Sequence, residues 1–523
     1  MTPARLDIAI LGGGMAGSLL ARQLARQLPE RRIAVFERKT EYELNVGESM
    51  VEIASDYFVR RLGLSSYLFD RHYPKNGLRF FFDSPQHDVP LEEMSEIGSS
   101  ALPLFPAFQI DRSRLESDLV AMNRQDGVLV DLETRVEKLE LGGSDADHRV
   151  TVSDGTTTRS IACRWVIDAT GRRQLISRLL GLRIPERRLR NASTWGWFEG
   201  VTDIDGFGPE SFRKRVRHTP RRLSTLHFLY RGYWIWFIPL QNGLTSIGVV
   251  GEAPHYRPEH RSEADFLSFL RSHAAVASLL VDAKPLATQC FTQLAYGTRQ
   301  FLSPDRWALV GEAAAFPDPF YSPGADFIAL ENDFVTDLIG RDLAGESRGD
   351  LEKRTTAYDE FLKFRFDAAM QLYLDQYSVF GSYELCKLKW DFDVACYYNL
   401  WISHYLHDQH LELREVRRQT RQRKPVLAAL SNFAALFRQI DAHLSRDGQY
   451  HRMNRGAYSN GQDLLGFIQT LAAPRTHREV LRQTEEIFNA VRDRALDLLE
   501  GAARQRSPMP LLWFMRPRDL RDG

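Results

Sequence analysis

Residues 7–17 of the chain read DIAILGGGMAG, an apolar run of strand type that leads into three consecutive glycines. Residues 18–24 continue with apolar side chains at helical spacing. A G-x-G-x-x-G motif placed on a strand, a turn and a helix is typical of dinucleotide binding. We expect Gly12 to turn the chain, Gly14 to let a pyrophosphate approach the backbone, and Gly17 to let the helix pack on the strand. This stretch predicts an α/β fold with a bound nucleotide.

The helix after the glycines begins near Met15 and Ala16, so its free N–H groups and positive dipole end would face the phosphates. A second predicted strand, residues 32–36, ends at Glu37, with Arg38 beside it. An acid about twenty residues beyond the last glycine accepts a hydrogen bond from a ribose hydroxyl. These residues favour FAD or NAD without deciding between them. A glycine turn that binds nothing agrees less well with the combination of strand, glycines, helix and acid.

The composition argues against several classes of partner. Lysine plus arginine and aspartate plus glutamate both number 68, so the net charge does not indicate nucleic acid or a membrane surface. No apolar run approaches the roughly eighteen residues of a membrane span, and the first residues lack the apolar region of a signal peptide. The four cysteines have no C-x-x-C spacing and are expected to stay reduced. We therefore expect a cytoplasmic protein without a metal site.

The length of 523 residues is enough for two or three domains, or for one large fold with a helical extension. The sequence changes character near residue 345. Beyond it, long helical patterns are found at residues 356–373, 408–422 and 478–502. We expect a cofactor-binding core over residues 1–345 and a helical region over residues 346–523 that covers the substrate site.

Two features of the helical region have alternative interpretations. The aromatic side chains of residues 373–405, which include Trp390 and Trp401, either cover a pocket or form the core between helices. The basic run from Arg414 to Lys424 is typical of a solvated helix face. Docking of an acidic carrier protein is the alternative for this run.

Two features of the core carry candidate chemistry. Lys75 stands just ahead of an aromatic strand at residues 78–82, where burial would lower its pKa and make it a proton donor or a nucleophile. A solvated surface lysine is the alternative. Residues 233–239 read YWIWFIP, and a strand with this sequence has Trp234 and Trp236 on one face and is apolar on both. Ordinary core packing is the alternative for this strand.

Several turns and helix starts suit close approach of a cofactor. One strand from residue 128 to 139 is predicted to form a hairpin with residues 149–152. A D-A-T-G turn follows a strand at residues 165–167, and the helix that opens at Ala325 offers a second anion site. The candidate cofactor residues outside the glycine motif are Glu48, Ser49, Arg112, Val136, Asp168, Gly311, Glu312 and Ala325.

With these pieces together, the chain resembles the flavin-dependent halogenases. Residues 234–239 match the W-x-W-x-I-P signature of that family, and residues 316–324 match F-x-x-P-x-x-S-x-G. Lys75, Gly77 and Phe80 are similar to the K-x-G-x-x-F segment around the family's lysine. The resemblance implies an FAD-binding, Rossmann-type α/β fold like that of para-hydroxybenzoate hydroxylase. An inserted substrate-side β-sheet and a helical C-terminal region would complete it.

The resemblance also implies an activity and its partners. A separate, transiently bound flavin reductase would supply FADH2, which with oxygen and chloride or bromide yields hypohalous acid. Lys75 would be the catalytic residue, and the backbone of Pro323 and Gly324 would hold the halide. The residues implied to lie between flavin and substrate are Trp234, Trp236, Tyr321 and Ser322. The substrate would be an electron-rich small molecule, free or tethered to a carrier protein, and the enzyme a monomer or a homodimer.

Two positions depart from the family's pattern. Tyr321 stands where the tryptophan halogenases have a glutamate, which favours phenol, pyrrole or acyl-type substrates over tryptophan. Glu312 replaces the aspartate of the usual G-D-A and is one methylene longer. The alternative functions are an FAD-dependent monooxygenase or oxidoreductase of the same fold that uses no halide, and a catalytically silent flavin-binding protein.

Overall fold

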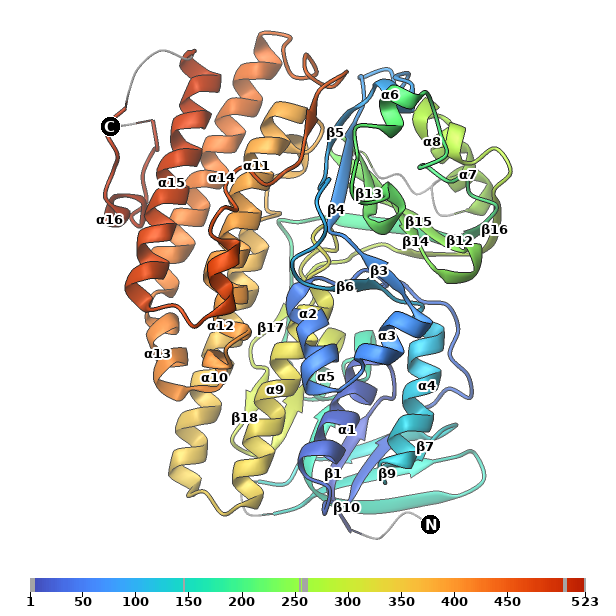
Figure 1. Cartoon of the computed structure of the whole chain (residues 1–523). Coiled ribbons are helices and arrows are strands. Elements are labelled where there is room, and N and C mark those ends of the chain that lie inside the picture. Colours follow the sequence, from blue (N-terminus) through green and yellow to red (C-terminus); the bar gives the residue numbers. More distant parts are fainter. Residues whose placement is uncertain (1–4, 144–145, 254, 256–261, 502–505, 522–523) are drawn as a thin grey trace.

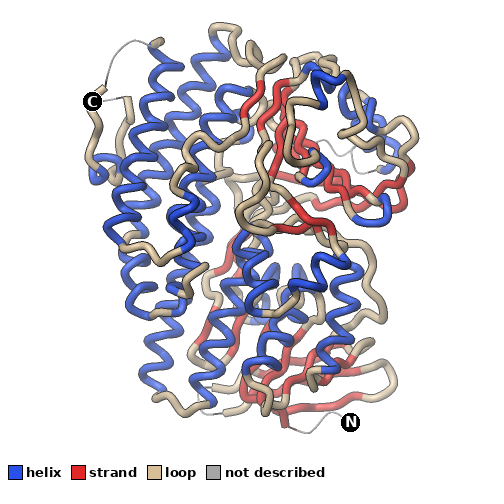
Figure 2. The backbone as a smooth tube through the Cα atoms, viewed as in Figure 1, coloured by secondary structure: helices blue, strands red, loops and turns tan. Residues whose placement is uncertain are grey.

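The computed structural model describes residues 5–143, 146–253, 255, 262–501 and 506–521. Two β-sheets lie one above the other in Figure 1, and the C-terminal helices run along both of them. Figure 2 makes the division visible, because strands and helices alternate in the first part of the chain and helices dominate the last part.

The first sheet carries the glycine motif. Its strands follow the order β18-β19-β10-β1-β2-β7, and β1 pairs in parallel with β10 and β2. Register places Leu11 beside Asp168 and Phe36, so the turns after these strands meet at one edge of the sheet. The strands are β1 (Arg5–Leu11), β2 (Ile33–Phe36), β7 (Leu129–Asp131), β10 (Thr158–Asp168), β18 (Leu302–Ser303) and β19 (Trp307–Leu309).

Helices bury this sheet. Residues 8–11 of β1 have no exposed side chain, which agrees with a strand covered on both faces. The helices of this part are α1 (Met15–Gln27), α2 (Glu52–Asp56), α3 (Ser65–Arg71), α4 (Arg112–Gln125), α5 (Leu175–Leu179) and α9 (Gly324–Leu343). The strand-turn-helix predicted from the glycine motif is therefore confirmed.

The prediction of one strand over residues 128–139 is wrong. Two strands replace it: β7 pairs in parallel with β2, and β8 (Arg135–Glu140) forms a hairpin with β9 (His148–Ser153). Glu133, between them, has a left-handed backbone with φ 56°, which breaks the extended run.

The second sheet follows the order β16-β12-β15-β14-β13-β4-β5-β20. Its strands are β4 (Leu78–Phe82), β5 (Ser95–Ile97), β12 (Asn191–Glu199), β13 (Thr225–Tyr230), β14 (Tyr233–Pro239), β15 (Thr245–Glu252), β16 (Lys284–Phe291) and β20 (Tyr458–Ser459). Strand β14 has the predicted alternation, with Trp234 and Trp236 packed in one core and Ile235 and Phe237 in another. Short helices α6 (Glu210–Arg213), α7 (Glu263–Arg271) and α8 (Ala274–Leu279) accompany this sheet.

Two short ribbons complete the strands. β3 (Tyr73–Lys75) pairs with β6 (Ala107–Gln109), and β11 (Arg183–Pro185) pairs with β17 (Tyr296–Thr298). Figure 1 places β3 and β6 between the two sheets. This position brings Lys75 to the junction of the two parts of the core.

The C-terminal region is helical, as predicted. The helices are α10 (Arg348–Gln371), α11 (Tyr383–Cys396), α12 (Ser403–Tyr405), α13 (Leu413–Arg421), α14 (Arg423–Arg446), α15 (His477–Glu500) and α16 (Leu511–Phe514). The helix predicted to begin at residue 408 starts instead at Leu413, because Asp408 has a left-handed backbone. In the part of the chain that is described, no helix combines the length and apolar character needed to cross a membrane.

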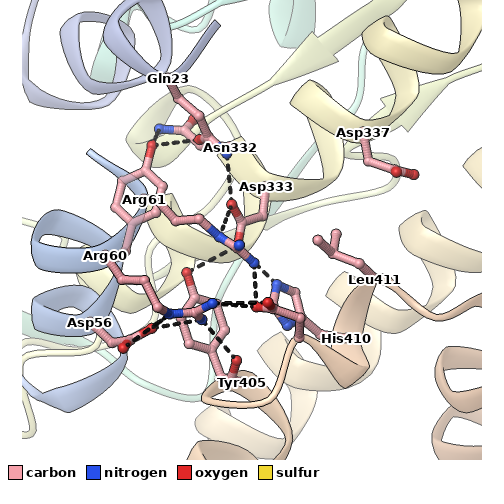
Figure 3. Close-up of polar contacts among 12 residues, drawn as sticks. Gln23, Asp56, Arg60, Arg61, Asn332, Asp333, Asp337, Tyr405, His410 and Leu411 are labelled. Carbon is pink, nitrogen blue, oxygen red and sulfur yellow. Dashed lines mark hydrogen bonds and ion pairs between the residues drawn. The ribbon is translucent and has the colours of Figure 1, made fainter. Parts of the chain in front are cut away.

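A buried polar cluster joins these helices to the first sheet (Figure 3). Its centre is Asp333 of α9, which is 2 % exposed. The carboxylate accepts hydrogen bonds from Gln23 of α1 at 2.7 Å and from Tyr405 of α12 at 3.1 Å. His410 Nε2 lies 2.9 Å from it, and Arg61 lies 3.3 Å from it. The cluster therefore connects α1 and α9 to the C-terminal helices through one carboxylate.

Candidate active site

A cavity of about 390 Å³ lies at the edge of the first sheet where its parallel strands end. Predicted cofactor residues that line it are Gly12, Gly14, Met15, Ala16, Glu37, Arg38, Glu48, Ser49, Arg112, Val136, Gly311, Glu312 and Ala325. The other end of the cavity is lined by Trp234 and Trp236 of β14 and by residues 322–324. The cavity thus extends from the glycine turn to the start of α9.

The three glycines of the motif serve different purposes. Gly12 has φ +107°, and a Cβ there would lie 2.4 Å from the Ala169 carbonyl oxygen. A Cβ on Gly17 would lie 2.0 Å from the Gly12 carbonyl oxygen, so this glycine is needed for close packing. A Cβ on Gly14 would meet no atom within 4 Å, because this position faces the cavity. Gly14 therefore leaves room for a ligand beside the backbone, as a pyrophosphate requires.

Glu37 and Arg112 line the end of the first cavity beside the glycine turn. The Glu37 carboxylate accepts hydrogen bonds from the N–H groups of Gly13 at 2.7 Å and Lys39 at 2.9 Å. This fixes the acid beside the glycine turn. Arg112 donates to Glu116, which also accepts the Met15 N–H at 3.2 Å. The groups around the start of α1 are thus fixed in place, and they fit a dinucleotide such as FAD.

Two predicted cofactor residues do not line the cavity. Gly17 lies behind the turn, where it packs. Asp168 is fully buried, and its carboxylate accepts hydrogen bonds from Thr170 Oγ1 at 2.6 Å and Ile176 N–H at 2.7 Å. These bonds use the carboxylate to hold the turn over residues 169–171, which does line the cavity. In the structure Asp168 therefore positions this turn, and a contact of its own carboxylate with the cofactor stays a prediction.

Substitution of Gly14 by valine tests the fit of the dinucleotide. A Cβ at this position meets no protein atom and the side chain extends into the cavity, so we expect an intact fold and FAD binding weakened about tenfold or more. Titration of the protein with FAD, followed by flavin fluorescence, measures this change. As the matched control, Gly17→Ala should lower thermal stability instead, because its Cβ strikes the Gly12 carbonyl. Unchanged FAD affinity in Gly14→Val would contradict the assignment.

The start of α9 forms the inner end of the first cavity. Pro323 is the residue just before this 20-residue helix and Gly324 is its first residue, so the positive end of the helix dipole faces the cavity here. Trp234 packs against Phe320 with ring centroids 5.2 Å apart. Trp234 and Trp236 thus line the first cavity, and Phe320 packs against Trp234.

A second cavity of about 580 Å³ lies on the other side of this junction. Its lining comes from both the core and the C-terminal helices, and it includes Lys75, Tyr321, Tyr373, Trp390, Tyr397, Tyr398 and Trp401. The aromatic residues 373–405 therefore line a pocket as well as packing between helices. Pro323 and Phe327 line both cavities, so the two meet at the first turn of α9.

Lys75 lies at this meeting point. It is 2 % exposed, and its Nζ donates hydrogen bonds to Ser49 Oγ at 2.8 Å and to the Met50 carbonyl at 2.6 Å. The Ser322 hydroxyl in turn donates to Ser49 Oγ at 2.9 Å. Ser49 and Ser322 line the first cavity and Lys75 lines the second. A chain of hydrogen bonds therefore runs from one cavity to the other.

Burial lowers the pKa of Lys75 to about 8, although the charges of Glu52 and Asp326 oppose this. Sequence reasoning missed both acids, which line the second cavity. The Asp326 carboxylate accepts hydrogen bonds from Ala54 N–H at 2.8 Å and Tyr397 OH at 2.6 Å. Burial raises the pKa of Asp326 to about 7. The signal in the sequence that could have identified Asp326 is its place in the first turn of the helix predicted to open at Ala325.

Tyr321, implied by the resemblance to lie between flavin and substrate, lines the second cavity. Its hydroxyl donates to Asp393 at 2.8 Å, and Asp393 also accepts from Lys389 at 2.7 Å. The tyrosine hydroxyl is thus tied to a buried ion pair on α11, and its ring forms part of the cavity wall.

Comparison with known proteins agrees with this geometry. The family model described as FAD binding domain matches residues 5–324. The chain is 29 % identical over 437 residues to "Flavin-dependent halogenase chlA" of Dictyostelium discoideum, covering 77 % of this chain and 71 % of that protein. It is 26 % identical over 348 residues to "1H-pyrrole-2-carbonyl-[peptidyl-carrier protein] chlorinase" of Pseudomonas fluorescens, covering 62 % and 73 %.

The solved structure of halogenase PltM in complex with phloroglucinol and FAD has a similar fold. The TM-score is 0.67 at 18 % sequence identity, and the match covers 95 % of this chain and 99 % of that one. With this coverage, the part of the chain that matches PltM includes C-terminal helices. The chain therefore belongs to the FAD binding domain family, and within that family it resembles the flavin-dependent halogenases.

Proposed function

We propose that this protein is an FADH2-dependent halogenase that transfers halogen from hypohalous acid to an electron-rich aromatic substrate. The observation that carries the proposal is the hydrogen-bonded chain of Lys75, Ser49 and Ser322. It joins the cavity beside the glycine turn to a separate aromatic cavity at the start of one helix. The separation suits a reaction in which a small oxidant passes from one site to the other.

The first cavity would hold the flavin. Gly14, the N-terminus of α1 and Glu37 would bind its nucleotide portion, and the tryptophans of β14 would lie near the inner end. Reduced FAD, supplied by a separate flavin reductase, would provide the two electrons that activate oxygen for halide oxidation. The backbone of Pro323 and Gly324 would hold chloride or bromide, because the helix dipole favours an anion where no side chain competes.

Lys75 would direct the oxidised halogen. As an ammonium it has three N–H donors. Ser49 and Met50 accept two of them, which leaves one for the oxygen of hypohalous acid in the second cavity. When the substrate carbon takes the halogen, that oxygen would accept the Lys75 proton and leave as water. The ring proton would return to the amine and regenerate the ammonium.

This role predicts the dependence of the halogenation rate on pH. Because the ammonium is the donor and its pKa is about 8, the rate should be constant below pH 8 and fall about tenfold per pH unit above it. Rates should be measured from pH 6 to 10 on N-methylpyrrole, whose ring carries no titrating group. A rate that rises through pH 8 would show that the neutral amine reacts instead.

The substrate class follows from the walls of the second cavity. Tyr321, Trp390 and Trp401 favour a planar ring such as a phenol or a pyrrole. Turnover with a reductase, NADH, FAD, oxygen and bromide over a panel of phenols, pyrroles and indoles tests the proposal. Mass spectrometry should find a bromine isotope doublet that requires halide. Hydroxylated product without halide would identify an FAD monooxygenase instead.

A further inference from the structure

Arg365 of α10 is a buried cation that lines the second cavity without a polar partner. It is 9 % exposed. Over the described residues, its guanidinium has no hydrogen bond and no ion pair. Burial lowers the pKa of Arg365 to about 10, so the group remains charged at neutral pH.

Two other buried arginines in the described part of the chain have an acid as partner. Arg79 and Arg221, at most 1 % exposed, both donate to the carboxylate of Glu96. A buried charge without such a partner is costly, because no group replaces its lost hydration. The difference between Arg365 and these two residues suggests that a bound molecule supplies the missing partner.

Trp401 fixes the orientation of Arg365. The guanidinium carbon lies 3.9 Å from the Trp401 ring centroid, so the face of the group is covered by the indole. This contact leaves the N–H groups on the edge of the planar guanidinium free to bond. An edge with two parallel N–H groups matches the two oxygens of a carboxylate.

The acid whose charge acts on Arg365 does not take this place. Asp326 acts on Arg365 by charge alone, since its carboxylate accepts hydrogen bonds from Ala54 and Tyr397. Burial also raises the pKa of Asp326 to about 7, so near neutral pH it compensates the guanidinium only in part. Glu52 accepts from the Tyr398 hydroxyl at 2.6 Å and is likewise engaged.

We propose that Arg365 binds a carboxylate of the substrate, so that the substrate class is an electron-rich aromatic acid. The ring would lie against the apolar wall of the cavity, between Arg365 and Lys75. A substrate joined to a carrier through its carboxyl group has no such anion, so the inference favours the free acid. That the acid is a substrate rests on the proposed function. That the acid binds at Arg365 is independent of the proposed function.

Binding of a matched acid and ester tests the inference without turnover. The probes are 2,4-dihydroxybenzoate and its methyl ester, titrated calorimetrically into the protein loaded with oxidised FAD. Wild-type protein should bind the acid more tightly than the ester. Arg365→Gln should weaken binding of the acid by about 10- to 100-fold and leave binding of the ester unchanged. Arg365→Lys, which keeps the charge without the planar fork, should give an intermediate affinity for the acid.

Arg417→Gln is the matched control, because it changes an exposed arginine of α13 and should bind both probes like the wild type. Equal affinity of wild-type protein for acid and ester would overturn the inference, and so would a parallel loss of both in Arg365→Gln. If Arg365→Gln does not fold, the affinities of wild-type protein and of Arg365→Lys for the acid and the ester still test the inference. A protein that binds the acid but yields no halogenated product would refute the proposed function alone.

Discussion

Lys75→Met is expected to lower the rate of halogenation by about 1000-fold while reoxidation of reduced FAD continues at the wild-type rate. Methionine preserves the volume of the buried side chain but donates no hydrogen bond to hypohalous acid. It leaves the glycine turn and Glu37 untouched, so FAD should still bind. Mass spectrometry of the brominated product measures the first quantity. Flavin absorbance after rapid mixing with oxygen measures the second.

Two comparisons make this result specific. Lys138→Met removes an exposed ammonium on β8 and should leave both rates unchanged. Free hypohalite released by Lys75→Met should halogenate a scavenger such as monochlorodimedone, because oxidation of the halide does not need the lysine. Halogenated substrate formed by Lys75→Met at near wild-type rate would remove Lys75 from the mechanism.

Much of the fold was predictable because local patterns and tertiary structure agree in the core. The packing around the glycine motif was predictable because it requires glycine at two positions. Gly12 and Gly17 have no space for a side chain, and the sequence has glycine at both. Strand β14 kept its predicted alternation because both of its faces are buried. The division of residues 128–139 was not predictable, because it depends on one left-handed residue, Glu133, and on pairing of β7 with a distant strand.

The candidate site was predictable only where a motif marks it. Lys75 and Ser322 lie in recognisable signatures, but the hydrogen bonds that connect them through Ser49 arise from folding. Arg365 lies on a helix whose pattern is that of ordinary packing, and it has no sequence neighbour that suggests a site. Asp326 follows the second signature directly, but its role in the second cavity depends on contacts that arise from folding. Asp168 was assigned to the cofactor because its turn resembles a binding turn, although its carboxylate stabilises that turn from behind.

The position of the second cavity depends on contacts between the core and the C-terminal helices. Residues of α9 form the floor where the two cavities meet, and residues of α10 and α11 form much of the remaining wall. The substrate site therefore exists only while these helices stay docked on α9. The buried cluster around Asp333 is one polar contribution to that docking (Figure 3), and the hydrogen bond from Tyr397 to Asp326 is another.

Asp333→Ala is expected to lower the free energy of unfolding by about 3 kcal/mol, because it removes the buried carboxylate that His410 contacts and one of the two acids paired with Arg61, the other being Asp408. Burial alone would raise the pKa of Asp333, but the hydrogen bond and charge of His410 and the charge of Arg61 outweigh burial and lower it. The ionised carboxylate therefore stabilises the fold above the ordinary carboxyl pKa. This contribution is lost as the pH falls through the lowered value in the folded protein.

Urea denaturation followed by circular dichroism at pH 7 and at pH 3, which lies below the ordinary carboxyl pKa, measures both effects. The difference between wild type and Asp333→Ala should shrink at the lower pH, because acid weakens the wild-type cluster and cannot weaken a cluster that lacks the carboxylate. Asp282→Ala removes an exposed acid between α8 and β16 and should follow the wild-type curve at both pH values. If Asp333→Ala unfolds like the wild type, apolar packing and the remaining polar contacts, such as that of Tyr397 with Asp326, are enough to hold the helices against α9. The substrate cavity would then withstand loss of the cluster, and halogenation by the variant should remain intact.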